Sequence, residues 1–97
     1  MPYIKNEDRQ KFIKDSNSGF IKLLDEVGNS CSNAGDLNYC FTVIAQNYLK
    51  QKGLNYQHIN DIVGALEGSK MEMYRRIAAP YEDTKIAQNG DVVVEGL

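Results

Sequence analysis

The 97-residue chain lacks tryptophan and has few residues suited to metal binding or nucleophilic chemistry: one histidine, His58, and two cysteines, Cys31 and Cys40. The cysteines lie nine positions apart, which is neither a zinc-knuckle nor a redox-motif spacing, and a zinc site needs further ligands. We therefore expect two reduced thiols, one in a loop and one packed in a helix, and a histidine at the start of a helix. These absences predict no cofactor and no catalytic nucleophile.

The chain also lacks an excess of one charge and long apolar runs. Its net charge is −2, which does not favour broad binding to nucleic acid or to anionic membranes. No apolar run reaches the roughly 18–20 residues of a membrane span, and no apolar signal segment follows the first residues. The sequence therefore predicts one cytoplasmic domain over residues 1–97 that stays off the membrane, for which oligomerisation is a natural source of stability.

Apolar residues recur with helical spacing along most of the chain, which predicts an all-α fold with three main helices. The first lies between Asn6 and Gly28. Its centre at residues 15–19 has five poor helix formers in a row, which leaves open whether it is continuous or broken. The second covers about residues 34–52, with Ser32 or Asn33 as its cap.

The third helix has the clearest apolar stripe and is expected to begin at a cap, Asn55, and to end before Pro80, because the residue before a proline disfavours helical conformation. The stripe consists of Ile59, Ile62, Val63, Leu66, Met73 and Ile77. This helix is longer than its partners need, so part of it is expected to form an oligomer interface. Pro80 starts a short fourth helix, and short terminal β-strands are expected at residues 91–95 and at Tyr3-Ile4.

Small residues interrupt the third helix in two rows, each with a spacing of four: Gly64 with Gly68, and Ala65 with Ser69. A glycine inside a helix costs about 1 kcal/mol relative to alanine. A close crossing of two backbones, within one chain or between chains, would offset that cost, whereas a kink or simple tolerance would not. We predict that these four residues form an oligomer interface.

Four carboxylates provide an enzymatic alternative, a magnesium-dependent nucleotide pyrophosphohydrolase of helical type. They are Glu67, Glu72, Glu82 and Asp83. Such enzymes place paired glutamates on one face of a helix, whereas Glu67 and Glu72 are five apart and diverge by roughly 140°. The paired-glutamate motif is missing, so an acidic, solvated face is the simpler interpretation.

The segment around Pro80 is the best candidate for a ligand site. Tyr74, Arg75 and Arg76 end the third helix, and Tyr81 follows Pro80. Arginine binds phosphates or carboxylates through its planar fork, and tyrosine rings stack on bases or cations. A salt bridge between Glu72 and Arg76, which have the i, i+4 spacing, is the structural alternative.

Several segments resemble a known family. They are residues 1–4 (MPYI) with 8–9 (DR), 35–39 (GDLNY), 53–57 (GLNYQ), 60–67 (NDIVGALE), 74–76 (YRR), 79–83 (APYED) and 89–92 (NGDV). In these segments the chain resembles a family of short uncharacterised proteins of bacteriophages and prophages. The resemblance is specific beyond residue 33 and poor over residues 14–34. It implies a phage-type context in the cytoplasm of a host bacterium and no catalytic residues.

Together these observations predict a non-enzymatic homo-oligomer that captures a small anionic, nucleotide-like ligand through Tyr74, Arg75, Arg76 and Tyr81. Several small helical phage proteins are oligomers that sequester nucleotide signals of host immunity, so the resemblance implies an anti-defence role by context. A protein–protein inhibitor of a host factor is a second hypothesis. The magnesium-dependent hydrolase is a third.

Overall fold

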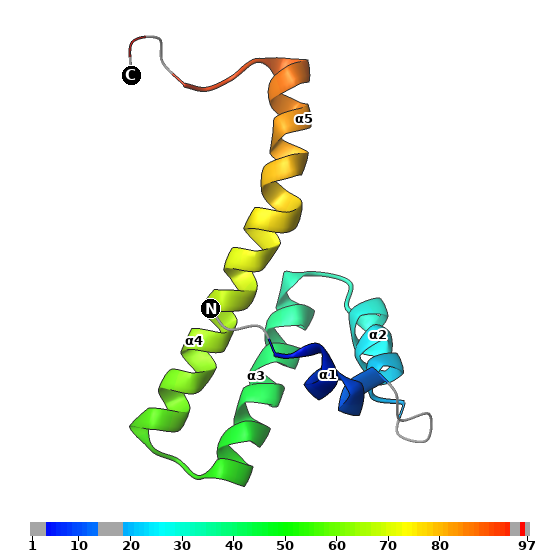
Figure 1. The fold of residues 1–97 in the computed structure, drawn as a ribbon, viewed down its shortest axis with the longest axis vertical. Coiled ribbons are helices and arrows are strands. Elements are labelled where there is room, and N and C mark those ends of the chain that lie inside the picture. Colours follow the sequence, from blue (N-terminus) through cyan, green and yellow to red (C-terminus); the bar gives the residue numbers. More distant parts are fainter. Residues whose placement is uncertain (1–3, 14–18, 94–95, 97) are drawn as a thin grey trace. The chain divides into compact units, whose positions relative to one another are not determined.

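The computed structural model describes residues 4–13, 19–93 and 96. These residues are mainly helical (Figure 1), as the apolar periodicity predicts. The chain divides into two compact units, Met1–His58 and Ile59–Leu97.

The first unit holds three helices: α1 (Asn6–Ile13), α2 (Phe20–Ser30) and α3 (Ala34–Lys52). The expected first helix is therefore broken, because Gly19 has φ 61° and ψ 28°, a left-handed conformation that a continuing helix excludes. Residues 14–18 lie outside the described part of the chain. The helices before and after them, α1 and α2, are in contact. The rings of Phe12 and Phe20 meet edge to face with centroids 5.9 Å apart.

The predicted bounds of α3 are confirmed, and its first turn shows why it begins at Ala34. The side-chain oxygen of Asn33 accepts a hydrogen bond from the Asp36 amide at 2.9 Å, so Asn33 is the cap. Asp36 Oδ2 in turn accepts from the Ser32 amide at 2.8 Å. This pair of bonds resembles a capping box and fixes the short connection from α2 to α3.

The connection from α3 to α4 (Tyr56–Met73) also follows from capping. Gly53, at φ 103°, ends α3, and the Asn55 side chain accepts from the His58 amide at 2.9 Å. The Nδ1 atom of His58 lies 2.7 Å from the Gly53 carbonyl oxygen, and its ring meets Tyr48 edge to face. The predictions that Asn55 caps the helix and that His58 belongs to its first turn are confirmed.

The predicted break before Pro80 is absent, although the predicted fourth helix is present, with Pro80 in its first turn and Gly90 after its last residue. After α4 the chain continues without a break through η1, a π-helical segment (Tyr74–Ala78), into α5 (Ala79–Asn89), as Figure 1 shows. Ala79 stays helical at φ −62° and ψ −49° despite the proline that follows it. We call this continuous stretch, residues 56–89, the rod.

The π segment shows how a helix passes through Pro80. Proline has no amide hydrogen, and in a regular α-helix its ring would meet the carbonyl four residues earlier, here that of Arg76. The Ala79 amide donates to the Tyr74 carbonyl, an i→i+5 bond that defines a wider π turn. The wider turn directly before Pro80 relieves the clash locally, which is why the helix continues.

The terminal strands do not form in the described residues. Gly90 ends α5, and the amides of Val92 and Val93 both bond to Asp91 Oδ1, at 2.7 and 3.2 Å. These amides bond to a side chain of their own segment, so the β-branched run has no strand ladder at its start, and Ile4 is not in a strand either. Tyr3, Val94 and Glu95 lie outside the described residues.

Within the described residues, no apolar side chain is buried, and Gly68 of α4 is the buried residue. Large apolar side chains are instead exposed along α2, α3 and the rod; those of α2 are 40–53% exposed. No helix in the described part is long and apolar enough to cross a membrane. The fold therefore shows amphipathic helices whose apolar faces remain in contact with solvent.

Replacing Pro80 with alanine tests the origin of the π segment. Pro80→Ala restores the amide hydrogen and removes the ring, so residues 74–79 are expected to return to α-helical hydrogen bonding. The free energy of unfolding should rise by about 1–3 kcal/mol, because proline is the residue least compatible with a helix interior. Urea denaturation measures this change, and an unchanged stability would show that the π turn has another cause.

Candidate functional site

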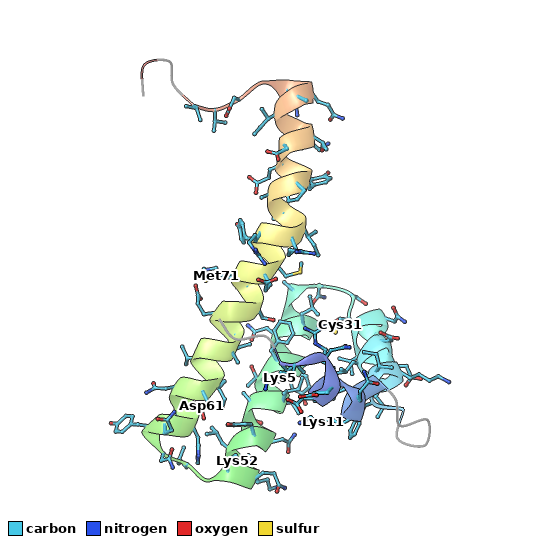
Figure 2. The ribbon with its side chains drawn as sticks, viewed as in Figure 1. Lys5, Lys11, Cys31, Lys52, Asp61 and Met71 are labelled. Carbon is cyan, nitrogen blue, oxygen red and sulfur yellow. The ribbon has the colours of Figure 1, made fainter. Side chains whose placement is uncertain are left out.

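The π segment contains the predicted ligand residues. Tyr74, Arg75 and Arg76 are its first three residues, and Tyr81 lies in the first turn of α5. All four belong to the second unit, and both tyrosines are 60% exposed. Figure 2 labels Met71 on the same rod, three residues before Tyr74. The predicted site is therefore a solvent-exposed stretch of helix in a single chain.

Arg75 forms the ion pair of this stretch. Its guanidinium Nη2 lies 3.2 Å from Glu72 Oε1, three residues earlier, and its side chain is 64% exposed. The sequence predicts the pair between Glu72 and Arg76 instead. Both spacings bring side chains within reach on a helix surface, and Glu72 takes the nearer arginine. Such an exposed pair adds little stability but holds the Arg75 fork in place.

Arg76 is exposed, and the contacts described for this part of the chain give it no ion pair. Consecutive residues of a helical segment point in different directions, so Tyr74, Arg75 and Arg76 spread around the rod. The structure brings Arg75 together with Glu72. A ligand that contacts both arginines needs a second surface opposite them.

Tyr81 has a cationic neighbour that the sequence prediction missed. Lys85 Nζ lies 5.5 Å from the centre of the Tyr81 ring, a cation–π distance. The signal was available, because Tyr81 and Lys85 have the i, i+4 spacing of facing helix residues. Lys85 therefore adds a second cationic side chain, besides Arg76, to the exposed surface near the tyrosines.

A shallow hollow of about 290 Å³ lies beside Lys85, where the last turns of α5 meet residues 90–92. It is lined by Glu82, Lys85, Ile86, Asn89, Gly90, Asp91 and Val92. Its size is near the lower limit for small-molecule sites. Neither arginine lines it, so the hollow and the arginine pair are separate features of the second unit.

The carboxylates of the enzymatic alternative are not brought together. Glu67 pairs with Lys70 at 3.5 Å, and Glu72 pairs with Arg75. Among the described residues, no three histidine, cysteine, aspartate or glutamate side chains form a group able to hold a metal ion. One chain thus provides no magnesium site from Glu67, Glu72, Glu82 and Asp83.

The two small-residue rows lie on α4, as predicted. Gly68 is buried, whereas a Cβ atom built at Gly64 would meet nothing within 4 Å. The cost of about 1 kcal/mol for a glycine inside a helix is therefore not offset at Gly64 by close packing in the described chain. Ala65 and Ser69 are exposed, like Gly64. A crossing by a second chain remains the prediction for this face.

A family model described as a domain of unknown function (DUF6899) matches residues 1–92. The match spans both units of the structure and includes the whole rod. No curated protein and no solved structure matches the chain. The comparisons therefore give a family without transferring an activity or a ligand.

Proposed function

We propose that this chain, which belongs to the DUF6899 family, is a non-enzymatic binding protein that acts as a homo-oligomer and captures a small anionic ligand. The ligand class is nucleotide-like, and the site is completed at a junction between subunits. The observation that carries the proposal is the rod: it presents apolar side chains, an arginine pair and two tyrosines together on exposed helix surface.

The exposed apolar side chains support self-association. Val63, Leu66 and Ile77 of the rod are 61, 45 and 57% exposed. Burying apolar surface contributes about 25 cal/mol per Å², the main source of folding and association free energy. A chain of 97 residues can bury only a small apolar core by itself. A second copy brings an equally apolar surface, and a symmetric dimer buries the same patch on both subunits.

The small residues favour the rod as the position of the proposed crossing. Open space beside Gly64 lets a second backbone approach closely. An interface over Gly64, Ala65, Gly68 and Ser69 would thereby offset the glycine cost.

The charges beyond this crossing favour an anion. Arg75 is positioned by Glu72, while Arg76 and Lys85 have exposed cationic groups. Guanidinium forks bind phosphate through paired hydrogen bonds, and the exposed Tyr74 and Tyr81 rings can stack on a base. Because one chain spreads these groups around a helix, the second copy supplies the opposing wall.

The resemblance to phage and prophage proteins supports a specific context for this ligand. In a host bacterium, sequestering a nucleotide signal would counter host immune signalling without any catalytic residue. This part of the proposal rests on the resemblance, whereas the anion site rests on Arg75, Arg76 and Lys85.

A protein inhibitor of a host factor is the second candidate function. One observation favours it: the apolar face of α2, which includes Phe20, Leu23, Leu24 and Val27, is exposed. Amphipathic helices bind partner proteins through such faces. A pull-down from host lysate with the full chain, compared with Leu24→Glu, tests this candidate. Retention of a host protein by the native chain alone would support it, and equal retention by both would exclude α2 as the binding face.

Arg76→Ala tests the anion site. Titration calorimetry of the folded chain against mono-, di- and cyclic nucleotides should give heat with at least one of them. Arg76→Ala should then lower the affinity at least tenfold, because a charge-assisted hydrogen bond is worth about 1.5–3 kcal/mol. Lys70→Ala is the matched control, since Lys70 lies on the same rod and pairs with Glu67. Absence of heat with every nucleotide would refute the anion site.

Gly64→Ala tests the subunit crossing. If a second backbone packs against Gly64, the added methyl group should raise the dissociation constant of the oligomer about tenfold or more. Sedimentation velocity measures this constant. In an uncovered helix the same change should only stabilise, by about 0.5–1 kcal/mol.

Gly28→Ala is the control for the crossing test. Gly28 also lies within a helix, α2, and a Cβ atom there also meets nothing within 4 Å. It should raise stability and leave the molar mass unchanged. Equal behaviour of the two variants would contradict a crossing at Gly64.

A further inference from the structure

The fold brings together two cysteines that the sequence separates. Cys31 lies in the connection after α2, labelled in Figure 2, and Cys40 lies in α3. Both thiols are free and half-buried, as the sequence predicts for a loop residue and a helix residue. Their sulfur atoms, however, are only 3.8 Å apart. The spacing of nine residues gave no sign of this contact.

Capping explains the proximity. Asp36 and Cys40 are four residues apart, so they share one face of α3. Asp36 Oδ2 accepts a hydrogen bond from the Ser32 amide at 2.8 Å, so the backbone directly after Cys31 lies against that same face. The Asn33 cap fixes the remaining residue of the connection. Because ordered hydrogen bonds set this geometry, the sulfur contact is a consequence of how α3 begins.

We propose that Cys31 and Cys40 form a reversible intramolecular disulfide, which makes the α2–α3 connection a site of oxidative modification. A disulfide needs a sulfur–sulfur distance of about 2.05 Å, so the two sulfurs must approach by about 1.8 Å. Side-chain rotation and small shifts of the short connection can supply this movement. Both thiols are partly exposed, so small oxidants reach them.

The oxidant is a low-molecular-weight disulfide, and the exchange balances in two steps. One cysteine thiolate attacks the oxidant, which forms a mixed disulfide and releases one small thiol. The second cysteine thiolate then attacks the sulfur of the first cysteine and expels the other small thiol. The two cysteines lose two electrons and two protons, and the oxidant becomes two thiols. A dithiol reductant reverses both steps.

The protonation state of the Cys31 thiol decides at which pH the disulfide forms readily. Partial burial raises the pKa of the Cys31 thiol above its ordinary value of 9.0, and the hydrogen bond with Cys40 and the nearby charges of Cys40 and Asp36 raise it further. The thiol form therefore dominates at neutral pH, and thiolate attack by Cys31 becomes faster as pH rises. The disulfide is expected to form slowly at pH 7 and faster at alkaline pH.

The disulfide would close a ring over residues 31–40 that includes the cap and first turn of α3. It would tie the end of α2 directly to α3, whereas hydrogen bonds of the connection hold the two helices in the reduced form. Cross-links of this kind stabilise chiefly by restricting the unfolded chain. The oxidised chain should have a Tm about 5–15 °C higher than the reduced chain.

Oxidised glutathione tests the proposal on the full chain. Incubation should lead to loss of two hydrogen atoms in the intact mass, no retained glutathione and no uptake of iodoacetamide. Cleavage before Asp36 should leave two peptides joined until a reductant is added. Cys40→Ser should instead retain one glutathione on Cys31 and show no rise in Tm.

The outcomes separate the proposal from its alternatives. A native chain that keeps two alkylatable thiols at pH 8.5, or carries only glutathione adducts or links between chains, would overturn it. Alkylation of folded Cys40→Ser before exposure to glutathione confirms that its remaining thiol is available. The Tm comparison adds a second readout, since adduct formation alone closes no ring.

Discussion

The structure depends on one constraint: the helices are amphipathic, yet within the described residues no apolar side chain is buried. Apolar burial is the dominant favourable term in folding, and the conformational entropy it must offset is of similar size. Capping and local pairs, such as Asn33 with Asp36, specify where helices begin but contribute only about 1 kcal/mol each. We propose that a second copy of the chain covers surfaces such as that of the rod.

The rod links this requirement to the candidate site. Pro80 would ordinarily end a helix, but the π turn from Tyr74 to Ala78 lets the helix continue to Asn89. As a result, the small residues of α4 and the ligand candidates of the π segment lie on one continuous helix. Assembly at Gly64 and anion binding at Arg76 would then use the same element. π segments are frequent at functional sites, where they redirect side chains without ending the helix.

Helix bounds and caps were predictable from the sequence because they depend on neighbouring residues. Features that depend on distant residues or on unusual hydrogen bonding were not. The bounds of α3, the Asn55 cap and the place of His58 follow from residue types that act within a few positions. The passage through Pro80 was missed because the usual rule assumes α-helical hydrogen bonds. The terminal strand was predicted wrongly for the described residues 91–93, because β-branched residues form a strand only where a partner strand exists.

The site itself was predictable only as a segment. Tyr74, Arg75, Arg76 and Tyr81 are exposed as a ligand site requires, but sequence spacing did not decide which arginine pairs with Glu72. Lys85 beside Tyr81 and the contact between Cys31 and Cys40 were missed for different reasons. The first was readable from the i, i+4 spacing, whereas the second required the geometry of the α3 cap.

The most direct test of this account is the molar mass of the folded chain, measured by sedimentation equilibrium together with Tm over about a hundredfold range of protein concentration. The account predicts a mass that is a multiple of 10.9 kDa and a Tm that rises with concentration, because the subunits cover each other's apolar surface. A cooperatively folded chain that keeps a mass of 10.9 kDa and a constant Tm throughout would contradict it.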